Sequence, residues 1–130
     1  MEESNPIRVG LTRKERFLVE EEHSAPHVGS GTVRVLATPW MIAFMEITAR
    51  KLLDEHLPDS HTSVGVHVDI HHVAAAKVEA VLEAKVAVIS YEGRRIGLSV
   101  KVAEGDRVIG EGSHQRVIVD KEKFLARVQD

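Results

Sequence analysis

The chain contains no cysteine among its 130 residues. Disulfides therefore cannot hold the fold together, no thiol can act as a nucleophile, and a zinc site built on thiolates is excluded. Aromatic residues are also scarce, at 4% of the sequence. Valine is abundant instead, which favours a β-rich chain with an aliphatic core.

Neither sign of charge dominates, because the formal net charge is only -3. This balance excludes the basic excess typical of nucleic-acid binding and the acidic run typical of a solvating tail. The longest mainly apolar stretch, residues 33–49, contains Arg34 and Glu46 and is too short to span a bilayer comfortably. The first 26 residues lack the apolar core of a secretory signal. We therefore expect one soluble, cytoplasmic domain covering residues 1–130.

One helix is clearly indicated. Thr38 suits the N-cap position and Pro39 suits the first helical position, where a missing N–H costs nothing. The following residues, up to Leu53, are apolar on almost all sides in the first three turns, where Glu46 is the only charge. A helix with that pattern is buried on most of its surface.

After the helix the hydrophobic period changes to two, which predicts strands. We expect strands at 63–73, 78–91, 96–103 and 108–119, with turns at 92–95 and 104–107. One or two short strands within 7–19, a loop at 20–31 and a short terminal helix at 121–128 complete the prediction. The order predicts an α+β fold in which a curved antiparallel sheet wraps around one long central helix. Such a sheet usually leaves an edge with which a second subunit can pair.

Two side chains of the helix are candidates for chemistry. Glu46 is surrounded by apolar residues, and a charged carboxylate there is costly unless it is paired. The structural alternative is a solvated stripe with Arg50, its i+4 neighbour. Thr38 is first of all an expected cap, but the N-terminus of a helix also favours a phosphate or a carbonyl oxygen that gains negative charge.

The strand at 63–73 supplies further candidates. His67 and His71 share one face and His72 points to the other, unless the strand bulges. Because His67 and His71 would lie about 13 Å apart, they cannot share one metal ion, and we expect no metal site. Gly65 lies among β-branched residues, which indicates either a bulge or a place where a ligand approaches the backbone.

Three blocks of sequence resemble the fluoroacetyl-CoA thioesterase-like family of the hotdog superfamily. They are ATPWM at 37–41 with Met45-Glu46, TSVGVHV at 62–68 running on to HHVAA at 71–75, and GEGSHQR at 110–116. The resemblance covers roughly residues 10–120. It implies the hotdog fold and hydrolysis of a thioester, with acyl-CoA as substrate and without a separate cofactor.

The resemblance also implies a site of Thr, Glu and His, which corresponds here to Thr38, Glu46 and His72. Gly65 matches a glycine expected to line the acyl-thioester site, and Arg116 matches a basic residue near the coenzyme A end. Thr38 and Glu46 are eight residues apart, about 12 Å along one helix, so they cannot touch. We therefore predict a homodimer whose two chains build a composite site, unless His72 and water bridge the gap.

In the mechanism we expect, His72 is the general base. Glu46 orients it or activates water, and Thr38 holds the thioester or water, or attacks as a nucleophile.

The segment 28–33 carries no aromatic residue that could close on a tiny fluorinated acyl group. A short, medium or aryl acyl group is therefore expected. A non-catalytic acyl-CoA binding module is the main alternative. A hydratase is a third reading, but its Asp-and-His motif is not found.

Overall fold

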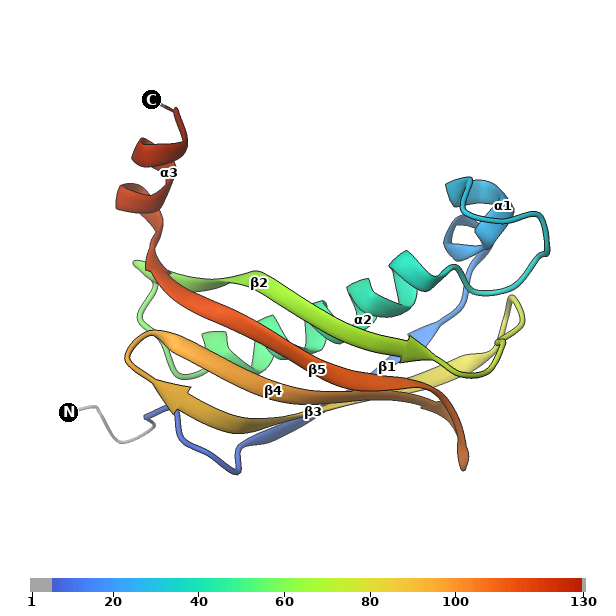
Figure 1. The fold of residues 1–130 in the computed structure, drawn as a ribbon, viewed down its shortest axis with the longest axis horizontal. Helices are drawn as coiled ribbons and strands as arrows, with labels where there is room; N and C mark the ends of the chain where they lie inside the picture. The colour runs from blue at the N-terminus through green and yellow to red at the C-terminus, as the bar shows by residue number, and fades with distance from the viewer. Residues whose placement is uncertain (1–5, 130) are drawn as a thin grey trace.

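The computed structural model describes residues 6–129, so both ends of the predicted single domain, residues 1–5 and 130, lie outside the described residues. The elements are β1 (Thr12–Leu18), η1 (Glu21–His23), α1 (Ala25–Val28), α2 (Thr38–Asp54), β2 (His61–His72), β3 (Val81–Glu92), β4 (Arg95–Glu104), β5 (Arg107–Asp120) and α3 (Lys121–Gln129). The strands form one antiparallel sheet in the order β1-β3-β4-β5-β2, curved around α2 (Figure 1). The predicted α+β arrangement is confirmed.

The core lies between α2 and the concave face of the sheet. Met41, Phe44 and Leu52 of the helix are buried against alternate residues of the strands, such as Val86 and Leu98. The sheet covers one face of α2, whereas the apolar residues Ile42, Ala43 and Ile47 on the rest of the helix are only half-buried. Within residues 6–129, no helix is long and apolar enough to cross a membrane.

Three local predictions need correction. Residues 78–80 precede β3 rather than belonging to it, and Glu79 has a positive φ of 79°. The segment predicted as a loop contains two short helical turns, η1 and α1. The single alternation predicted for β2 is broken by a bulge between Gly65 and His67. Gly65 therefore faces the helix side, opposite Arg116, whereas His67, Asp69 and His71 face outward.

Candidate functional site

The first cluster joins the start of α2 to the end of β2. Thr38 Oγ1 and His72 Nδ1 lie 2.7 Å apart, a hydrogen bond between residues 34 positions apart in the sequence. The pairing of β2 with β5 places His72 opposite Gly110, on the face of the sheet that carries the helix. A hydroxyl bonded to an imidazole nitrogen is an arrangement that can transfer a proton from an attacking oxygen.

Thr38 reaches His72 because its side chain does not cap the helix. The N-cap is Ala37, and Thr38 is the first residue of α2, so the predicted cap was wrong by one position. The N–H groups of Trp40 and Met41 already bond to the carbonyl of Ala37, and Pro39 has no N–H. In the first helical turn, only the N–H of Thr38 is thus left as a possible donor to a thioester oxygen.

His72 is half-buried, and this partial burial favours its neutral form. Its Nε2 atom is buried without a hydrogen-bond partner among the described residues. Burial lowers the pKa of His72 below the usual 6.5, and the nearby backbone of Ala74 opposes that shift only in part. A neutral imidazole is able to accept a proton at neutral pH.

The second cluster surrounds Glu46, further along α2. Its Oε2 atom lies 3.6 Å from Nη1 of Arg116 and 3.8 Å from Nε2 of His114. Arg50, the partner that a solvated stripe would require, pairs instead with Asp54. Glu46 therefore belongs to a cluster with two side chains of β5, and its own side chain stays 43% exposed.

Arg116 is buried and fixed from several directions. Its Nε donates to Ser63 Oγ at 2.7 Å and its Nη2 to the Ser63 carbonyl at 2.9 Å. Burial lowers the pKa of Arg116, while the negative charge of Glu46 opposes this effect. In this chain the guanidinium thus faces Glu46 inside the fold.

His114 was not singled out by the sequence analysis, although it lies in the third block of the resemblance. Arg116 Nη1 lies 3.1 Å from His114 Nε2, and because a guanidinium only donates, that nitrogen accepts. Nδ1 then carries the proton and donates it to the carbonyl of His67 at 2.8 Å. Burial is also the main cause that lowers the pKa of His114. The signal in the sequence was that His114 and Arg116 share the buried face of β5 with Ile118.

Gly65 makes room for this second cluster. A Cβ atom at this position would overlap the Glu46 carboxylate and come within 3.2 Å of His114 Cε1. The bulge next to Gly65 and its missing side chain let the Glu46 carboxylate approach β2, which is an edge strand of the sheet.

The structure thus divides the predicted residues into two groups. Thr38 and His72 form one, while Glu46, Gly65 and Arg116 form the other, together with His114. The two groups are separated by eight residues of α2, about 12 Å of helix. Within residues 6–129, no three His, Asp or Glu side chains gather as metal ligands.

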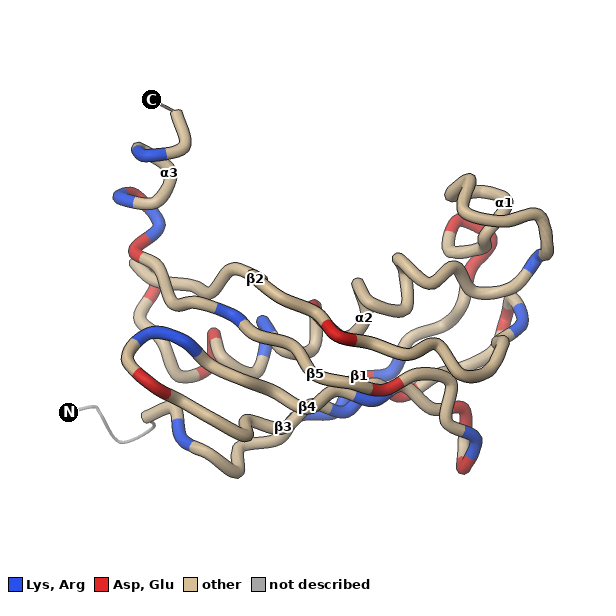
Figure 2. Tube along the Cα trace, viewed as in Figure 1, with Lys and Arg blue, Asp and Glu red and all other residues tan. Residues whose placement is uncertain are grey.

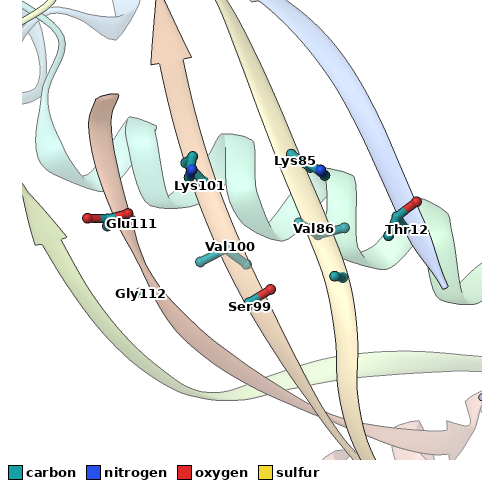
Figure 3. A pocket seen from close by; sticks show the side chains of 9 residues that line it. Thr12, Lys85, Val86, Ser99, Val100, Lys101, Glu111 and Gly112 are labelled. Atoms are coloured by element: carbon teal, nitrogen blue, oxygen red, sulfur yellow. The ribbon is translucent and has the colours of Figure 1, made fainter. Parts of the chain in front are cut away.

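A hollow of about 510 Å³ lies away from both groups, on the face of the sheet opposite α2 (Figure 3). It arises because the small side chains of Ala87 and Ser99 are neighbours on β3 and β4, next to the longer pair Lys85 and Lys101. Nothing in this hollow resembles the paired hydroxyl and imidazole of the first cluster, so the candidate site is on the helix side.

Comparison with known proteins decides the family. The model of the fluoroacetyl-CoA-specific thioesterase family matches residues 19–122. The chain belongs to this family. A curated relative, the fluoroacetyl-CoA thioesterase of Streptantibioticus cattleyicolor, is 30% identical over 95 residues, which are 73% of this chain and 68% of that protein.

Solved structures support the same assignment. A structure of the fluoroacetyl-CoA thioesterase superposes with a TM-score of 0.89 at 27% identity and covers 95% of this chain and 96% of that one. A thioesterase superfamily member from Thermus thermophilus gives a TM-score of 0.87 at 26% identity, covering 95% and 92%. A hot-dog-like protein from Thermanaerovibrio acidaminovorans gives 0.86 at 26% identity, covering 95% and 91%. The predictions of a hotdog fold and of a thioester hydrolase family are confirmed.

Proposed function

We propose that this protein hydrolyses an acyl-CoA thioester to the free acid and coenzyme A. The observation that carries the proposal is the 2.7 Å contact between Thr38 and His72. Hydrolysis breaks the bond between the carbonyl carbon and sulfur, and the attacking oxygen must lose a proton in the process. His72 is placed to take that proton from the Thr38 hydroxyl, or from a water that this hydroxyl holds.

The proposed site needs a second chain, because one chain keeps its two groups apart. β2 is an edge strand, and its middle exposes Val66 (48%) and Val68 (42%). An apolar, unpaired edge invites pairing with another strand. A second copy of this chain, pairing antiparallel through β2 about a two-fold axis, would cover both valines and extend the sheet.

The register of that pairing brings the two groups together. The continuously exposed part of β2 is residues 65–69, centred on His67. If His67 lies opposite itself, Gly65 lies opposite Asp69 of the partner subunit. His72 of the partner subunit is then three residues further, about 10 Å along the strand, whereas the chain's own His72 is seven residues away, about 23 Å. Glu46, which lies beside Gly65, would therefore serve the partner's Thr38 and His72.

In this composite site each group has a distinct role. The Glu46 carboxylate, held by the Arg116 guanidinium, orients the attacking water or balances the charge that His72 gains. Gly65 leaves the space in which the thioester meets that carboxylate. Arg116 positions Glu46 and adds positive charge near a developing oxyanion. A cysteine-free chain that acts on acyl-CoA fits a cytoplasmic enzyme.

The direct test is release of free thiol from a panel of acyl-CoA esters, including acetyl, fluoroacetyl, hexanoyl and phenylacetyl groups. We expect release from short, medium or aryl esters without strong selection for fluoroacetyl, because the segment 28–33 lacks an aromatic residue. Tight binding of every ester without release would favour the non-catalytic binding module instead.

The pH dependence of hydrolysis gives a separate prediction. Since burial lowers the pKa of His72 below 6.5, the imidazole remains neutral down to a lower pH than a free histidine. We expect kcat/KM to fall as pH decreases and to be level where His72 is neutral; burial moves the midpoint down, and the carboxylate of the partner's Glu46 moves it up. A stopped assay across pH 4.5–8 measures this midpoint. A rate that does not fall on acidification would show that His72 is not the base.

A further inference from the structure

The C-terminal helix α3 is unusual because it contributes nothing to the core. None of its residues is buried, and Leu125 (54%) and Val128 (66%) expose apolar side chains. Figure 1 shows α3 rising past the β2 edge at one end of the sheet, while α1 rises past the same edge at the other end. A two-fold axis through the middle of β2 would exchange these ends, so that α3 of each copy approaches α1 of the other.

The side chains of α3 lie on two different faces, and one face already contacts its own chain. Lys123, Ala126 and Arg127 line a groove with Arg94 and Asp120 of the same chain. At 100° per residue, the remaining apolar side chains, Phe124, Leu125 and Val128, gather on the other side of the helix. The apolar face of α3 therefore points away from its own chain.

The register of the proposed dimer determines what this face meets. Asp120, the last residue before α3, pairs with His61 at the start of β2. With His67 opposite itself, His61 lies opposite Val73 of the partner subunit. Nine helical residues measure about 14 Å, nearly three strand spacings of about 4.8 Å, so α3 is long enough to pass over the partner's edge.

The surface at that position is also apolar and exposed. Val73 is 56% exposed and lines a hollow of about 310 Å³ with Val35, His72, Ala74 and Ala75, and Val33, two residues before Val35 in the chain, is 66% exposed. Figure 2 shows basic residues along α3, but two of them, Lys123 and Arg127, line the groove on its own chain, so the face turned away from that chain is mainly apolar. A second copy of this chain would thus cover three apolar surfaces. They are the β2 edge, the apolar face of α3 and the surface that exposes Val33 and Val73.

We propose that α3 is an arm that packs its apolar face on Val33 and Val73 of the partner subunit and forms one wall of the partner's thioester site beside His72. This inference rests on the proposed dimer. It adds a third element to each composite site: Thr38 and His72 come from one chain, whereas Glu46 and α3 come from the other. The acyl-CoA would then enter between the arm and the partner's α1.

The absence of native cysteine makes a clean cross-linking test possible. Chains carrying Val128→Cys and chains carrying Val33→Cys, with different tags, are co-expressed and treated with a short bismaleimide. We expect a covalent heterodimer. Val9→Cys replaces Val33→Cys in the control, because Val9 is similarly exposed (60%) but precedes β1, at the opposite edge of the sheet. That combination should give little covalent product.

A truncation tests the role of the arm in binding. Ending the chain after Lys121 removes the apolar face but keeps the hydrogen bond from Lys121 N to Ser60 O. We expect a dimer whose KM for acyl-CoA rises several-fold. If the protein is dimeric and active but gives no Val128–Val33 product, or if the truncation leaves KM unchanged, the proposed role of α3 is wrong while the proposed function still stands. A monomeric or inactive full-length protein would instead overturn the proposed function.

Discussion

Replacement of His72 by alanine is expected to lower kcat/KM for acyl-CoA hydrolysis by about 10²- to 10⁴-fold, the range typical of a lost general base. The variant removes the acceptor for the Thr38 proton and leaves the hydroxyl without its partner at 2.7 Å. The fold should persist, because His72 lies at the end of an edge strand and its Nε2 makes no hydrogen bond within the described residues. Thiol release and a thermal melt measure the two effects.

His71→Ala is the matched control for this variant. His71 is adjacent in sequence, but it is exposed and faces the other side of the sheet, opposite Glu111. We expect it to keep nearly full activity. Equal activity in the His72 and His71 variants would remove His72 from the mechanism.

Variants of Thr38 separate the two possible attacking oxygens. If the Thr38 hydroxyl only holds a water, Thr38→Ser should retain most activity and no acyl-enzyme should be trapped by rapid quenching. If Thr38 attacks directly, an ester adduct at residue 38 should accumulate when the second step is slow. Thr38→Ala should be impaired in both cases, since the hydroxyl bonded to His72 is lost.

Replacement of Glu46 by glutamine should lower kcat by about 10²- to 10³-fold, because it removes the charge that the proposed site places at the reacting centre while keeping the shape of the side chain. The loss of stability should be small, since Arg116 retains its hydrogen bonds to Ser63 and His114. The partly exposed ion pair with Glu46 is also screened by solvent. The ratio of kcat values and the melting temperatures test both statements.

Two further variants sharpen the Glu46 prediction. Glu83→Gln is the control, because Glu83 is exposed on the face of the sheet away from α2. Gly65→Ala should mimic the loss of Glu46, because the added methyl group would displace the carboxylate. A fully active Gly65→Ala variant would contradict the role assigned to this space.

The sequence was sufficient to predict the long helix, the strand meander and the family, because each depends on local periodicity and short motifs. Contacts that depend on register could not be predicted. The pairing of Thr38 with His72 requires the end of β2 to meet the start of α2, and the contact of Glu46 with His114 requires the bulge beside Gly65. The expected cap at Thr38 was wrong because Ala37 occupies that position without a capping side chain.

The proposed site combines Thr38 and His72 of one chain with Glu46 of the other. It is tested by mixing two inactive variants, His72→Ala and Glu46→Gln, in one co-expressed preparation. Half of the dimers would then be mixed, and each mixed dimer would contain one intact site, so about a quarter of the wild-type activity should return. If the site lay within one chain, every site would carry one substitution, and activity no higher than that of the two separate variants would contradict the account.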